Sequence, residues 1–101
     1  METTPNLEQK HGLLFSPGLI VETPGALAIL HQYNLHPIRL IARHLSGDWG
    51  DVSSEDSAAN QYALANGGQV RSCYVMAAGE RLWVTTESDR CVTTIMLPSE
   101  R

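Results

Sequence analysis

Glu87 and Arg90 stand at the two ends of a short polar segment between two runs of β-branched and aromatic residues. An acid beside arginines on a sheet is the equipment of general acid–base ribonucleases, which also place helices before an antiparallel sheet. Arg71 or Arg81 could join this group. Such sites generally also use a histidine on the sheet, and no histidine follows His44. A small nuclease-like enzyme is therefore kept as the alternative to the leading functional hypothesis, which is stated at the end of this subsection.

The histidines give no metal-binding pattern. All four of them, His11, His31, His36 and His44, precede the expected sheet. His36 and His44 are too far apart to lie on one helical turn, and no Cys-x-x-Cys or His-Glu-x-x-His motif accompanies them. We therefore expect partly exposed helix histidines, with no metal and no other cofactor.

The two cysteines are expected on one sheet face, on strands that flank a middle strand. Cys73 and Cys91 would then be about 10 Å apart, which is too far for a disulfide. The sequence predicts two buried, reduced thiols and no disulfide.

The loop Asp48-Trp49-Gly50-Asp51 has two alternative roles. An aromatic ring between two carboxylates could engage cations or stacked rings of a partner. Alternatively, Trp49 tucks under the third helix while Asp48 and Asp51 cap and turn the chain. A lone tryptophan in a short loop is usually buried, which favours the structural role.

Length and composition indicate one globular domain. The chain has 101 residues, of which 43% are hydrophobic and 18% charged, and its net charge is −4. This acidity makes nucleic acid an unfavourable partner. No apolar run approaches the roughly 20 residues that cross a bilayer, and the N-terminus lacks a signal pattern, so we expect a cytoplasmic protein without a membrane partner. Residues 1–12 are expected to form a loose tail and residues 13–101 a single α+β domain.

The pattern of apolar residues and turn signals predicts the order of the elements. Pro24 and Pro37 suit first helical positions, and Ser53 with Asp56 marks another helix start. The predicted fold is α+β: a short N-terminal strand, three helices, then a three-stranded antiparallel meander with helices packed on one sheet face. The strands are expected at 18–22, 69–77, 81–87 and 90–97, and the helices at about 23–33, 37–46 and 54–65.

Loops of two residues, 78–79 and 88–89, would fix the register of the meander. Val75 would then face Leu82, and Val84 would face Thr93. The core face would comprise Cys73, Val75, Leu82, Val84, Thr86, Cys91, Ile95 and Leu97. The opposite face would carry the candidate interaction surface, which comprises Tyr74, Met76, Arg81, Trp83, Glu87, Arg90 and Met96. Aromatic and methionine side chains are enriched in interface cores, so this face predicts a protein partner or self-association.

Two segments carry a resemblance to a known family. His44-Leu-Ser-Gly-Asp-Trp-Gly-Asp51 and Leu82-Trp-Val-Thr-Thr-Glu-Ser-Asp-Arg90, with Gly67-Gly68 between them, resemble small plasmid-related proteins of bacterial plasmids and integrative elements. The likeness covers about residues 18–100. It implies a mobile-element context in a bacterial host and no established activity. Cys91 stands where the family pattern has serine.

The leading functional hypothesis combines these observations. We expect a non-catalytic accessory protein of a mobile genetic element that acts through protein–protein interaction. Self-association and inhibition of a host defence system are two versions of it.

Overall fold

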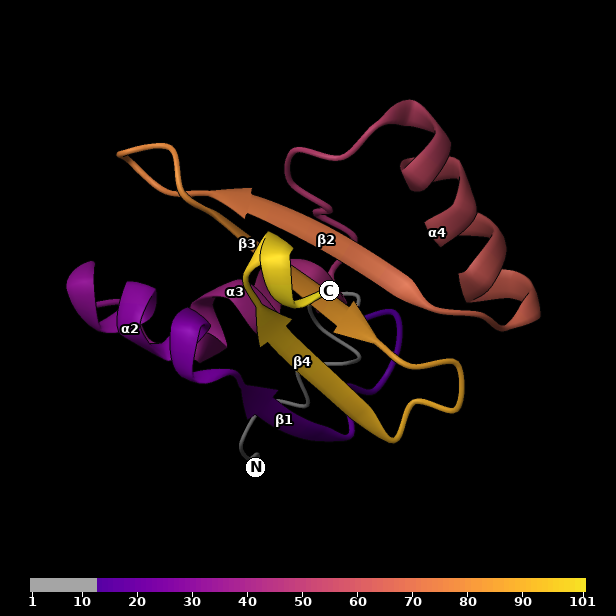
Figure 1. The fold of residues 1–101 in the computed structure, drawn as a ribbon. Coiled ribbons are helices and arrows are strands. Elements are labelled where there is room, and N and C mark those ends of the chain that lie inside the picture. The colour runs from indigo at the N-terminus through magenta and orange to yellow at the C-terminus, as the bar shows by residue number, and fades with distance from the viewer. Residues whose placement is uncertain (1–12) are drawn as a thin grey trace, which may run out of the picture.

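The computed structural model describes residues 13–101. The expected loose tail at 1–12 therefore lies outside the described residues. In chain order the elements are β1 (Leu19–Glu22), α2 (Pro24–Gln32), α3 (Pro37–Leu45), α4 (Ser54–Asn66), β2 (Val70–Val75), β3 (Arg81–Thr86), β4 (Val92–Met96) and the short 3-10 helix η1 (Pro98–Glu100) (Figure 1).

The four strands form one mixed sheet in the order β1-β4-β3-β2. Strands β2, β3 and β4 make the expected antiparallel meander. Strand β1 extends it by pairing in parallel with β4, so that Leu19 lies beside Val92. The α+β class with three helices is thus confirmed, and the sheet has a fourth strand that pairs in parallel.

Local capping explains where the helices begin. Thr23 accepts a hydrogen bond from the Ala26 N–H, and Ser53 accepts one from the Asp56 N–H. His36 does the same for α3 through its ring nitrogen. Pro24 and Pro37 occupy first-turn positions, where the missing N–H costs nothing. These side chains account for all three helix starts.

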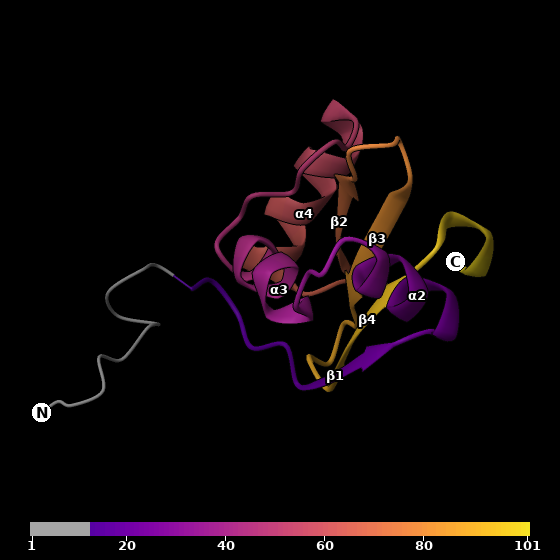
Figure 2. The ribbon, with the colours of Figure 1, turned by 90° about the vertical axis from the view of Figure 1, so that its left-hand side faces the viewer.

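The helices and the sheet bury one main core. Figure 2 views the sheet nearly along its edge, with α3 and α4 on one side and the C-terminal turn on the other. The fully or almost fully buried apolar side chains of this core are Ala26, Leu30, Leu40, Ile41, Leu45, Tyr74, Leu82, Val84 and Ile95. One face of the sheet therefore packs on helices, and the other does not.

The expected register between β2 and β3 is wrong by one residue. Met76 N–H donates to the Glu80 carbonyl over 2.7 Å, which closes a loop of three residues with Gly79 at φ +97°. Three-residue hairpin loops use such a glycine, and the extra residue shifts β2 relative to β3. Tyr74 consequently lies opposite Leu82 and is 1% exposed on the helix side.

Because side chains alternate along a strand, this shift exchanges the two faces of β2. Cys73 and Val75 were predicted on the core face and lie on the opposite one. Tyr74 was predicted on the open side and lies in the core. Met76 packs against the same core, so the two residues leave the candidate interaction surface together.

The register between β3 and β4 differs from the prediction by two residues, which leaves the faces unchanged. Val84 lies opposite Ile95, and Trp83 lies opposite Met96 on the other face. The loop is longer than expected, since Glu87 N–H donates to the Val92 carbonyl and Arg90 adopts φ +62°. The predicted strand start at Arg90 is therefore wrong, and Cys91 is an exposed loop residue.

Candidate functional site

The sheet face away from the helices is the candidate interaction surface, and we call it the open face. It is formed by Leu19 and Val21 of β1, Arg71, Cys73 and Val75 of β2, Arg81, Trp83 and Thr85 of β3, and Val92, Thr94 and Met96 of β4, with Glu87 just past β3. Three of its apolar side chains are exposed, namely Leu19 (68%), Val75 (45%) and Val21 (39%). The structure thus brings four of the predicted surface residues together, Arg81, Trp83, Glu87 and Met96.

Arg90 was also predicted on this face and lies elsewhere. Its guanidinium donates to the Gly68 carbonyl over 2.6 Å and to the Ala63 carbonyl over 3.2 Å, at the end of α4. It also lies 5.4 Å from the ring centre of Phe15. The positive φ at Arg90 turns the side chain toward the helical layer, so it fastens the β3–β4 loop to α4.

The C-terminal turn covers one part of the open face. The Arg101 guanidinium lies 4.0 Å from the ring centre of Trp83. Glu100 accepts hydrogen bonds from the Thr23 hydroxyl over 2.6 Å and from the Leu97 N–H over 2.8 Å. The Thr23 hydrogen bond, followed by that of Leu97, lowers the pKa of Glu100. These contacts hold η1 beside the sheet.

Between this turn and the strands lies a hollow of about 410 Å³, lined by Gln69, Arg71, Thr85, Glu87, Met96, Glu100 and Arg101. The Glu87 carboxylate accepts a hydrogen bond from Gln69 over 2.9 Å. Among residues 13–101, neither Arg71 nor Arg101 has a carboxylate within ion-pair distance. The hollow therefore combines two guanidinium groups with the carboxylates of Glu87 and Glu100.

The loop of Asp48, Trp49 and Asp51 is built into the fold. Trp49 is 6% exposed and packs against Ala63 and Val70. Asp51 forms an ion pair of 2.9 Å with Arg81 on the open face. This burial fits the structural role for Trp49, while Asp51 brings the loop to the border of the open face.

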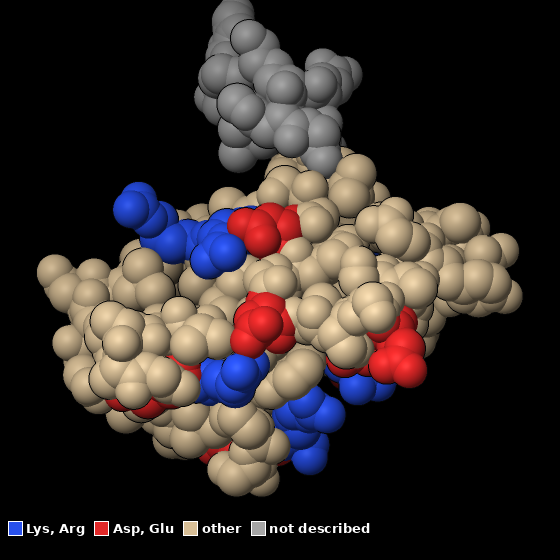
Figure 3. Space-filling view, turned by 90° about the horizontal axis from the view of Figure 1, so that it is seen from above, with Lys and Arg blue, Asp and Glu red and all other residues tan. Residues whose placement is uncertain are grey.

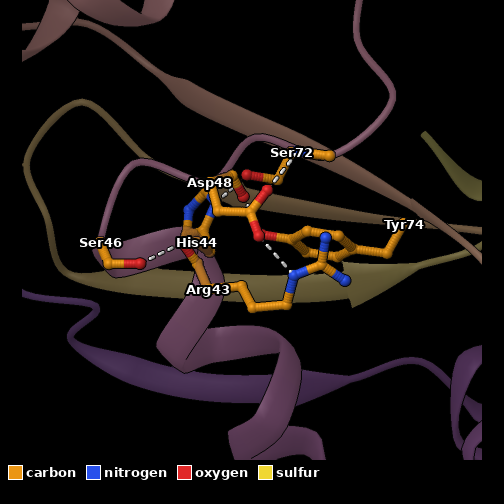
Figure 4. Close-up of polar contacts among 7 residues, drawn as sticks. Arg43, His44, Ser46, Asp48, Ser72 and Tyr74 are labelled. Carbon is orange, nitrogen blue, oxygen red and sulfur yellow. Dashed lines mark hydrogen bonds and ion pairs between the residues drawn. The ribbon is translucent and has the colours of Figure 1, made fainter.

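Asp48 belongs to a polar cluster at the end of α3. Arg43 donates to the Asp48 carboxylate over 2.7 Å and lies 4.4 Å from the Tyr74 ring centre. Tyr74 donates its hydroxyl proton to the Asp48 carbonyl over 2.7 Å (Figure 4). The hydrogen bond from Arg43 lowers the pKa of Asp48, and burial raises the pKa of Tyr74 to about 12. The cluster therefore keeps its charges and fixes the loop.

A buried chain of hydrogen bonds begins at His44, which was predicted to be partly exposed and is completely buried. Its Nδ1 lies 2.6 Å from the Ser72 hydroxyl and its Nε2 lies 2.9 Å from the Thr86 hydroxyl. Thr86 is 2.6 Å from Thr93, which donates to the Pro17 carbonyl over 2.7 Å. The chain joins α3 to three strands and to the segment before β1.

The Pro17 carbonyl, at the end of this chain of hydrogen bonds, determines which atom in each hydrogen bond carries the proton. A carbonyl only accepts, so the Thr93 proton goes to Pro17 and Thr93 accepts from Thr86. Thr86 must then accept from the imidazole, which places the proton of neutral His44 on Nε2. Ser72 donates to Nδ1. Every hydroxyl in the chain donates once, so the buried polar groups are satisfied.

The Ser72–His44 pair has the spacing of a nucleophile and its base, but both side chains have no exposed surface. Burial, together with the nearby charge of Arg90, lowers the pKa of His44 to about 4. A histidine kept neutral and enclosed holds the structure together. The signal in the sequence was the position of His44 one turn after Leu40, on the buried stripe of α3.

Charges on the face of the molecule seen from above are of mixed sign. Figure 3 shows arginine side chains beside acidic ones on the face seen from above, without a large area of one sign.

In the part of the chain from 13 to 101, no three His, Cys, Asp or Glu side chains are placed to hold a metal ion. Both cysteines are free: Cys73 is buried beneath Arg81, and Cys91 is exposed, contrary to its predicted burial. No helix in the described residues is long and apolar enough to cross a membrane.

The fold and the open face define an α+β protein whose sheet is covered by α-helices on one side and only in part, by the C-terminal turn, on the other. No family model, curated protein or solved structure matches the chain.

Proposed function

We propose that the protein is a non-catalytic binding protein that engages another protein through the open face of its sheet. The observation that carries this proposal is that exposed Leu19, Val21 and Val75 and half-buried Trp83 and Met96 all lie on the same face of the sheet. Isolated apolar side chains are common on protein surfaces, whereas several on one face together with an aromatic side chain are more typical of interaction sites.

The mobile-element context is part of the proposal. It is supported by the resemblance to plasmid-related proteins in residues 44–51 and 82–90. An accessory protein of this kind acts by contact with a host or element protein, and inhibition of a host defence system is one such action. The buried His44 and the mixed surface charge agree with a binding role without chemistry of its own.

A matched pair of variants tests the open face. Thr94→Arg places a large charged side chain at the centre of the face, from a position whose side chain does not enter the core. Tyr62→Arg places the same side chain on α4, where Tyr62 is 67% exposed. With equal amounts of folded bait and lysate of a host that carries the gene, Thr94→Arg should reduce the captured partner about tenfold or more, and Tyr62→Arg should not.

Equal capture by both variants would exclude the open face as the binding surface. Circular dichroism and thermal unfolding of both variants establish that a loss of capture does not come from unfolding.

The hollow beside η1 favours a second candidate, a nuclease-like enzyme. Glu87 lines it together with Arg71 and Arg101, and an acid with two guanidinium groups could act on a phosphodiester. Arg90 is removed from this candidate because it binds backbone carbonyls near α4.

Purified protein incubated with labelled RNA tests the candidate: cleavage that Glu87→Gln and Arg71→Ala each abolish would support it. If RNA stays intact at a large molar excess of protein, the enzyme alternative is wrong.

A further inference from the structure

The two edges of the sheet differ in whether their backbone groups have partners. On the β2 edge, the side-chain amide of Asn60 bonds both backbone groups of Arg71, over 2.7 and 3.0 Å. The next outward residue, Cys73, donates to the Trp49 carbonyl over 2.9 Å and accepts from the Asp51 N–H over 2.7 Å. These contacts prevent another strand from pairing along most of β2.

The β1 edge has no such cover in the described part of the chain. Leu19 and Thr23 donate their N–H groups to Cys91 and Ile95 of the β4 segment, over 2.9 and 3.0 Å. Backbone groups alternate in direction along a strand, so those of Ile20 and Glu22 point away from the sheet. Within residues 13–101, no backbone hydrogen bond reaches them. An open strand edge of this kind recruits another strand.

We propose that the occupant is a second copy of this chain, whose β1 pairs antiparallel with β1 of the first around a two-fold axis at Val21. This inference rests on the proposed function, because self-association through β1 is one form of the proposed protein–protein interaction. In this arrangement Ile20 lies opposite the partner's Glu22, and Glu22 lies opposite the partner's Ile20. Each of these pairs exchanges two backbone hydrogen bonds.

The ends of β1 select this register. One step further outward, Pro24 has no N–H to donate, and Gly18 leaves the strand with φ +64°. Centring the pair on Ile20 would therefore keep only the hydrogen bonds of one residue pair. Centring it on Val21 uses every outward group of β1. It also avoids placing Glu22, the one charged residue of β1, opposite its own copy.

The side chains agree with the same two-fold axis. Val21 and Leu19 are the exposed apolar residues of β1, and both lie on the open face. Pairing at Val21 brings the two Val21 side chains together and joins the two open faces into one surface. Because the β2 edges are covered, the joined sheet has no free edge of equal length. Assembly thus stops at two copies instead of continuing into a fibre.

Light scattering coupled to size-exclusion chromatography, repeated over a range of concentrations, tests this pairing. The wild-type mass should rise from 11.1 kDa toward twice that value as concentration increases. Glu22→Pro removes an outward N–H that the single subunit does not use, so it should raise the dissociation constant by about tenfold or more. Val75→Pro, which also removes an outward N–H but on β2, is the matched control and should leave dimerisation unchanged.

A second pair of variants tests the same β1 pairing without introducing proline. Val21→Lys should weaken the dimer by placing two ammonium groups side by side, whereas Val75→Lys, at the opposite edge of the same face, should not. A strictly monomeric wild type, or a dimer that tolerates both Glu22→Pro and Val21→Lys, would overturn the inference. In either case capture of a partner that Thr94→Arg abolishes would leave the proposed function standing, so the two failures are distinguishable.

Discussion

Replacing His44 with alanine is expected to lower the free energy of unfolding by about 3–5 kcal/mol near neutral pH. The change removes a fully buried ring and leaves the hydroxyl groups of Ser72 and Thr86 without their partner. Urea unfolding followed by circular dichroism measures the loss. His31→Ala, at an exposed position of α2, is the control and should change the free energy by less than about 0.5 kcal/mol. A loss that small for His44→Ala would contradict the role of the hydrogen-bond chain.

The same residue should make stability depend on pH. Burial lowers the pKa of folded His44 to about 4, whereas an unfolded histidine has its ordinary value of 6.5. Between these values the unfolded chain holds a proton that the folded protein lacks, so stability rises with pH. The contribution is complete above about pH 6.5 and is lost as pH falls toward 4, by roughly 3 kcal/mol. His44→Gln cannot titrate and should show a flatter dependence across this window, whatever its absolute stability.

The second large effect is expected at Arg90. Arg90→Ala should lower the free energy of unfolding by about 2–4 kcal/mol, because the Ala63, Gly68 and Glu87 carbonyls lose a charged donor. Arg90→Lys should recover little, since one ammonium cannot reproduce the fork of a guanidinium. Arg39→Ala, on the exposed side of α3, is the control.

The backbone conformation at Arg90 predicts an order of stability among Arg90 variants that loss of the guanidinium alone does not predict. Its φ of +62° suits glycine better than alanine. Arg90→Gly should therefore be about 1 kcal/mol less destabilising than Arg90→Ala, although both lack the guanidinium. If alanine and glycine unfold at the same urea concentration, the left-handed conformation does not contribute.

Local chemistry made the helices predictable, whereas loop geometry limited the prediction of the sheet. Thr23, Ser53 and the two prolines act within a few residues, so the helix starts follow from sequence. The face that Tyr74 occupies depends on whether the β2–β3 loop holds two or three residues, and Ala78-Gly79 fits either. The β3–β4 loop was also misjudged, but by two residues, so Trp83 and Met96 kept their predicted face.

Non-local contacts explain what the sequence did not reveal of the candidate site. The partners of His44, Ser72 and Thr86, lie on two different strands, and the Arg90 guanidinium binds carbonyls brought near by the packing of α4. The hollow forms only because η1 returns to the sheet through Glu100 and Thr23. None of these contacts has a signature at fixed spacing.

The parallel pairing of the first and last strands has a consequence for synthesis. Leu19 lies beside Val92, so β1 cannot join the sheet until β4 has left the ribosome. At about 5–20 residues per second, the nascent chain carries an unpaired β1 for several seconds. The helices and the β2–β3 hairpin can form during that interval because their contacts are more local, whereas β1 joins the sheet only after β4 is available.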